Sequence, residues 1–181
     1  MNNQGTSRGE DTGILTGMFR DRESTETAYQ SLRDRGYTDD DINVIMSDET
    51  RDKYYTNADG EAELGSKALE GTGAGAAIGG TLGAIIGGIA AIGTNVLLPG
   101  VGLVVAGPIV AALVGAGAGG ATGGLVGALI GWGIPEDRAA EYETGIKEGG
   151  TVLGVKPRSN EDADYFENHW RTNARGENIY R

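Results

Sequence analysis

Hydrophobic and polar positions divide this chain into two mixed outer parts and a central part without charge. Between Glu70 and Glu136 no residue carries a charged side chain, and glycines recur there at every fourth position in two stretches. Positions four apart lie on one face of an α-helix, so each stretch would form a groove of small residues. Such faces let two helix backbones pack closely, as membrane helices often do. The two glycine combs are Gly71, Gly75, Gly79, Gly83 and Gly87, and then Gly115, Gly119, Gly123, Gly127 and Gly131.

We predict that residues 66–134 form a long antiparallel glycine-zipper helical hairpin, with helix packing through these ten glycines. Its helices would cover about 68–92 and 108–132, joined by a tip at 93–107. A glycine inside a solvated helix costs about 1 kcal/mol relative to alanine, so ten would cost on the order of 10 kcal/mol. Close backbone packing or a bilayer must offset that cost. The face of the first helix opposite its glycines is apolar and would meet lipid or other protein.

The outer parts of the chain predict a small α/β domain in two pieces, residues 13–65 and 135–156. Residues 1–12 form a polar lead that we expect to be disordered, and residues 157–181 form a polar tail with a possible docking helix at 165–170. Short apolar runs predict strands, and amphipathic runs with Asp or Ser before them and Gly after them predict helices. The expected strands cover 13–19, 42–47 and 151–155, and the expected helices cover about 21–35 and 136–148.

This order of elements predicts a three-stranded βαβ-αβ domain interrupted by the hairpin. A parallel sheet is the simplest topology, and a ferredoxin-like sheet with one edge missing is the alternative. Residues 48–65 are polar and would form a loop or a short helix around 50–56.

Four segments carry a resemblance to a known family: GYTDDDINVI, LLPGVG, GIPEDRAAEYETGIKEGGTVLGV and DYFENHWRTNA. They resemble the bacterial heat-induced general stress protein family, with its YflT-like domain. The resemblance covers roughly residues 13–175. It implies induction under stress and supplies no catalytic residues.

The charge distribution argues against nucleic acid as a partner. The chain has 15 Lys and Arg against 26 Asp and Glu, and no cluster of basic residues. Proteins that bind nucleic acid neutralise phosphates with such clusters, and polybasic attraction to anionic lipid needs them too. Any membrane contact would therefore come from apolar insertion. The chain has no cysteine, so thiol catalysis and disulfides are excluded, and its polar start predicts a cytoplasmic N-terminus.

No pattern of residues predicts catalysis, a cofactor or a metal. Residues 115–120 match G-x-G-x-x-G, but the comb continues past them, which a dinucleotide-binding loop has no reason to do. His169 is the only histidine, and we expect it to face solvent or pack locally. Asp39, Asp40 and Asp41 fit a turn better than a cation site. No serine lies in a G-x-S-x-G setting.

The sequence therefore predicts a non-catalytic stress-response protein that self-associates through the glycine-zipper hairpin. Helices of about 24 residues would be about 36 Å long, enough to cross a hydrocarbon core of about 30 Å. We expect the protein on the cytoplasmic side of the inner membrane, with lipid as a partner, or in the cytoplasm as a large homo-oligomer. The alternative is a soluble, oligomeric ligand-binding or sensor module.

Overall fold

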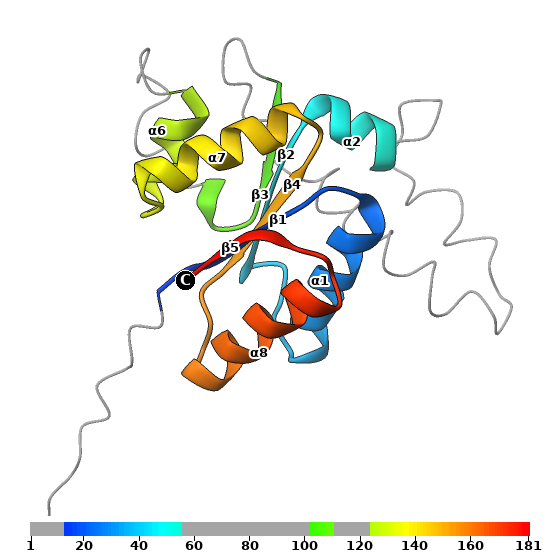
Figure 1. The fold of residues 1–181 in the computed structure, drawn as a ribbon, viewed down its shortest axis with the longest axis vertical. Helices are drawn as coiled ribbons and strands as arrows, with labels where there is room; N and C mark the ends of the chain where they lie inside the picture. The colour runs from blue at the N-terminus through cyan, green and yellow to red at the C-terminus, as the bar shows by residue number, and fades with distance from the viewer. Residues whose placement is uncertain (1–12, 56–101, 111–123) are drawn as a thin grey trace, which may run out of the picture.

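A computed structural model describes residues 13–55, 102–110 and 124–181 of the chain (Figure 1). In this part, five strands form one sheet in the order β3-β2-β4-β1-β5. The strands are β1 (Leu15–Phe19), β2 (Ile42–Ser47), β3 (Leu103–Ala106), β4 (Thr151–Val155) and β5 (Glu177–Tyr180). The helices are α1 (Arg22–Asp34), α2 (Asp48–Tyr55), α6 (Gly124–Gly131), α7 (Glu136–Lys147) and α8 (Asn160–Thr172).

The mixed α/β class is confirmed, but a parallel sheet is wrong. Every pair of neighbouring strands runs antiparallel. Strands β1 and β2 do point the same way, as a helical crossover requires, but β4 lies between them and pairs with both. The crossover through α1 therefore skips one strand. The strand between them, β4, begins more than 100 residues after β2 ends.

Helices cover both faces of the sheet (Figure 1). Helices α1 and α8 contribute to one buried cluster, and α6 and α7 contribute to the other. Alternate residues of each strand pack into the two clusters in turn, since successive side chains point to opposite faces of the sheet. In β1, for example, Leu15 and Phe19 lie toward α1 and α8, whereas Met18 lies toward α7.

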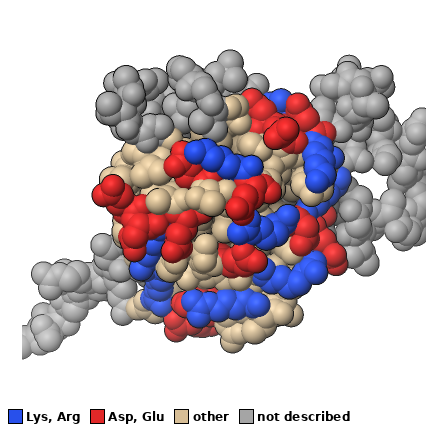
Figure 2. All heavy atoms as spheres, turned by 45° about the horizontal axis from the view of Figure 1, so that its top comes forward, with Lys and Arg blue, Asp and Glu red and all other residues tan. Residues whose placement is uncertain are grey.

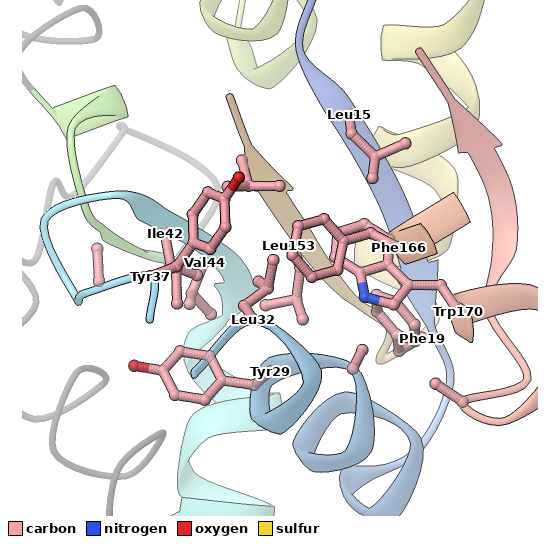
Figure 3. Packing of buried hydrophobic residues seen from close by; sticks show 14 of the residues in the cluster. Leu15, Phe19, Tyr29, Leu32, Tyr37, Ile42, Val44, Leu153, Phe166 and Trp170 are labelled. Carbon is pink, nitrogen blue, oxygen red and sulfur yellow. The ribbon is translucent and has the colours of Figure 1, made fainter. Parts of the chain in front are cut away.

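Aromatic rings from α8 fill the first cluster, as Figure 3 shows. Trp170 is fully buried, and its ring meets Phe19 edge-on with centroids 5.5 Å apart. The indole N–H donates to the hydroxyl of Ser31 at 3.2 Å, so the one polar atom of the ring has a partner. A Cβ added at Gly17 would lie 3.0 Å from this ring. Strand β1 therefore accommodates Trp170 only because residue 17 is a glycine and has no side chain.

The helix boundaries follow the signals expected from the sequence. The side chain of Asp21 accepts a hydrogen bond from the N–H of Ser24 at 2.8 Å and caps α1. Gly36 ends that helix with a φ of +78°, a conformation that suits glycine. Helix α7 buries the three predicted positions, Ala139, Tyr142 and Ile146. The docking helix is confirmed as the longer α8, and the polar segment after β2 is confirmed as the short helix α2.

The predicted hairpin tip is wrong where the structure describes it. Residues Leu103–Ala106 form the edge strand β3, with Ser47 opposite Leu103 and Val44 opposite Ala106. This run is apolar at every position because both of its faces are buried, one in each cluster. The chain therefore returns to the sheet in the middle of the predicted hairpin.

Eight of the ten comb glycines lie outside the described residues, as do the boundary at 66, the lead at 1–12 and the first hairpin helix. The other two, Gly127 and Gly131, lie in α6, so the second helix is confirmed over Gly124–Gly131. The pairing of the two combs stays a prediction.

Candidate functional site

A hollow of about 400 Å³ lies where the start of β1 meets the beginning of α7. Three basic residues line it: Arg138, Lys156 and Arg181. Its apolar wall comes from Ile14, Ile134 and Pro135. Among the described residues, no aspartate or glutamate lines the hollow, although acids outnumber bases in the chain by 26 to 15.

The antiparallel sheet brings two of the basic residues together. Strand β1 lies between β4 and β5, with Leu15 opposite Val155 and Thr16 opposite Tyr180. Lys156 follows Val155, and Arg181 follows Tyr180. Both basic residues therefore lie beside the chain that leads into β1. A Cβ added at Gly13 would lie 3.8 Å from the carbonyl carbon of Arg181, which confirms how closely these ends approach.

The third basic residue comes from the first turn of α7. The turn before this helix uses Gly133 with a φ of +96°, and Pro135 precedes the first helical residue. Among the side chains that the structure describes, none caps this helix end. The N–H groups of a first helical turn lack partners within the helix, and the helix dipole favours negative charge there.

A buried phenol holds α7 against the sheet beside the hollow. The hydroxyl of Tyr142 lies 2.7 Å from both the hydroxyl of Thr16 and the carbonyl oxygen of Asn178. Because a carbonyl can only accept, Tyr142 donates to Asn178 and accepts from Thr16. Burial raises the pKa of Tyr142 above its ordinary value, so the phenol keeps its proton.

The guanidinium of Arg138 is oriented by an aromatic ring. It lies over Tyr180, with 4.2 Å from its central carbon to the ring centroid. Its Nη1 is 3.5 Å from the carbonyl oxygen of Arg181. Within the described part of the chain, no aspartate or glutamate side chain forms an ion pair with Arg138. Stacking leaves the N–H groups at the edge of a guanidinium able to bind an anion.

Arg181 has polar partners of its own. Its Nη1 is 2.7 Å from Asp164, whose side chain is 72% exposed, and its Nη2 donates to Asn160. Tyr180 donates to Glu141 at 2.6 Å, and this hydrogen bond raises the pKa of Tyr180. Asp164 and Glu141 thus bind Arg181 and Tyr180, and neither acid lines the hollow.

The other candidate groups serve structural roles. His169 stacks on Tyr165 with ring centroids 5.6 Å apart, so the expected local packing is confirmed. Asp41 accepts from the N–H of Thr38 at 2.8 Å, and this bond, with Arg158 nearby, lowers the pKa of Asp41. In residues 13–55, 102–110 and 124–181, no three His, Asp or Glu side chains gather as a metal site would require.

The two described comb glycines do not approach the hollow. They lie on the side of α6 that faces away from the sheet, whereas Leu125 and Leu129 are buried beneath it. Sequence reasoning missed the hollow altogether. Its basic residues are separated by 18 and 25 positions, a spacing that no local motif encodes.

No family model, curated protein or solved structure matches the chain. The resemblance to the heat-induced general stress proteins therefore stays a prediction. Over the described ranges, no helix combines the length and apolar character that crossing a bilayer requires. On the face drawn in Figure 2, basic and acidic side chains are interspersed.

Proposed function

We propose that this chain is a non-catalytic stress-response protein that self-associates through its glycine-bearing helices. The α/β domain would hold these helices in place. The stress context rests on the family resemblance described above. The self-association rests on one observation: α6 turns its leucines into the domain and its glycines outward.

The two faces of α6 are opposite because of helical geometry. Gly127 follows Leu125 by two residues, and Gly131 follows Leu129 by two, a rotation of about 200° in each case. Leu125 and Leu129 are 1% and 0% exposed. Among the described residues, a Cβ added at Gly127 would meet no atom within 4 Å, and Gly131 is exposed. No described residue therefore fills the groove of α6 at Gly127.

The orientation of α6 changes the role expected for the apolar face of this helix. The sequence suggests that the apolar faces of the hairpin meet lipid or other copies. In α6, the leucines instead belong to the buried cluster shared with α7 and the sheet. The open groove is then the surface left for association, and a second glycine groove fits it best because two small faces allow close backbone contact. That groove would come from residues 71–87 or from another copy.

A lipid membrane remains a proposed second partner. The uncharged residues 71–101 and 111–123 could insert in a bilayer while the acidic domain stays outside. The protein would then lie on the cytoplasmic side of the inner membrane. Without insertion it would form a large homo-oligomer in the cytoplasm.

The test measures the mass of the full chain by light scattering, with and without detergent. We expect a species larger than the 18.7 kDa monomer in plain buffer. Gly127→Leu should reduce that mass, because the added side chain fills the groove without disturbing the leucine face. Thr144→Leu adds similar bulk at an exposed position of α7 and should leave the mass unchanged.

A monodisperse monomer of the wild-type chain without detergent would refute the self-association. An unchanged mass for Gly127→Leu would refute the role of the groove. Sedimentation with membranes after carbonate extraction would identify lipid as a partner, and its absence would leave the soluble oligomer.

A further inference from the structure

We propose that the hollow between β1 and α7 binds a phosphate monoester carried on a small organic group. This site is separate from the self-association proposed above and does not depend on it. The proposal rests on the convergence of Arg138, Lys156 and Arg181 on one hollow, which no acidic residue lines in the part of the chain that the structure describes.

The charge of the lining selects an anion. Two guanidinium groups and one ammonium group provide donors for several oxygens at once, and charge-assisted hydrogen bonds are stronger than neutral ones. Lys156 is exposed and Arg138 is half-buried, so both remain accessible to a ligand from solvent. A dianion with three terminal oxygens matches three cations better than a carboxylate does. These features favour a phosphate monoester.

The size and the apolar wall select an organic phosphate over the inorganic ion. A volume of about 400 Å³ lies within the range of small-molecule sites, roughly 300 to 1,000 Å³. Inorganic phosphate would fill only a small part of it. Ile14, Ile134 and Pro135 line the remainder and offer an apolar surface to an aromatic or aliphatic group.

The site is positioned by buried structure. Arg138 stacks on Tyr180, and one turn further along α7 Tyr142 is bonded to β1 and to Asn178. Lys156 directly follows the central strand β4. The ring of Trp132 occupies the space over Gly154, where an added Cβ would lie 2.1 Å from it. Trp132 thus lies between the lining residue Gly133 and the strand that carries Lys156, and it can report binding.

Phenyl phosphate is the probe, because it combines the dianion with an apolar ring. Binding to the full chain is measured by calorimetry and by tryptophan fluorescence, to which Trp132 and Trp170 both contribute. We expect saturable binding of phenyl phosphate, with weaker binding of inorganic phosphate and of phenol. Lys156→Gln, at an exposed position, should weaken binding about fivefold, and the double change with Arg138→Gln should weaken it at least about tenfold.

Two matched control variants each remove one positive charge at a position away from the hollow. Lys147→Gln lies in the last turn of α7, and Arg175→Gln lies beyond α8, where its side chain is 65% exposed. Both should bind the probe as the wild type does. Equal circular dichroism and thermal midpoints would show that all the variants are folded.

Phosphate monoesters also occur as lipid headgroups, so a second arm uses phosphatidylcholine vesicles with and without phosphatidic acid. Weaker binding of phenyl phosphate or of phosphatidic acid vesicles by the Lys156→Gln variant supports the site. An effect on phenyl phosphate identifies a soluble ligand, and an effect on the vesicles identifies a lipid headgroup. The proposal is overturned if neither probe binds at millimolar concentration. It is also overturned if the hollow variants and the controls bind the probes equally.

Discussion

The side-chain oxygen of Asn43 accepts a hydrogen bond from the backbone N–H of Ile109 at 2.6 Å. Asn43 lies inside β2 and is buried, and its amide group also donates to the carbonyl oxygen of Gly154 at 3.2 Å. One side chain therefore joins β2, β4 and the chain that follows β3. It holds the start of the second glycine-rich segment against the sheet.

Asn43→Ala should destabilise the domain by about 1 to 3 kcal/mol, because it leaves a buried N–H and a buried carbonyl without these partners. The free energy of unfolding in urea measures the effect. Asn168→Ala, at an exposed position of α8, serves as the control and should change stability little. Equal stability of both variants would show that the Asn43 hydrogen bonds contribute nothing net.

Gly107→Ala should be more destabilising than Gly36→Ala. Both glycines have a positive φ, +96° and +78°, which costs an alanine about 1 to 2 kcal/mol. A Cβ at Gly107 would also lie 2.1 Å from the carbonyl oxygen of Ile42, whereas one at Gly36 would meet no atom of the described residues within 4 Å. Overlap with fixed backbone adds about 1 to 3 kcal/mol. Comparing the unfolding free energies of the two variants isolates this contact, and similar losses would contradict the close approach of Gly107 to β2.

Stability should fall as the pH rises from about 10 to about 12, partly through Tyr37. Burial raises the pKa of Tyr37 to about 12, and its hydroxyl donates to Asp162 at 2.7 Å. The unfolded chain loses this proton near pH 10, whereas the folded chain retains it. The contribution of Tyr37 to the free energy of unfolding is therefore complete below pH 10 and is lost as the pH rises toward 12.

Thermal midpoints measured between pH 9 and pH 12 test this expectation. Tyr37→Phe should lower stability at neutral pH and make the alkaline loss shallower. Burial raises the pKa values of Tyr29, Tyr55 and Tyr142 as well, so part of the loss should remain in this variant. A Tyr37→Phe profile as steep as that of the wild type would contradict the role of Tyr37.

The sequence predicted local elements well and long-range pairings poorly. The strand at Ile42–Ser47 and the helix at Glu136–Lys147 lie within one residue of their expected ends. By contrast, Leu103–Ala106 looks like part of an apolar loop until its pairing with β2 is known. Strand β5 (Glu177–Tyr180) was not expected, because its polar residues at the sheet edge give no alternating pattern.

The sequence by itself determined where α1 ends, which residues of α7 face the core, and that α6 carries a glycine face opposite a leucine face. Caps, glycine stops and helical period act over a few residues, so they can be recognised without the fold. Only the tertiary structure decided the antiparallel strand order and the hollow. These depend on contacts such as Thr16 with Tyr142, 126 residues apart, and no local pattern specifies which distant strands will pair.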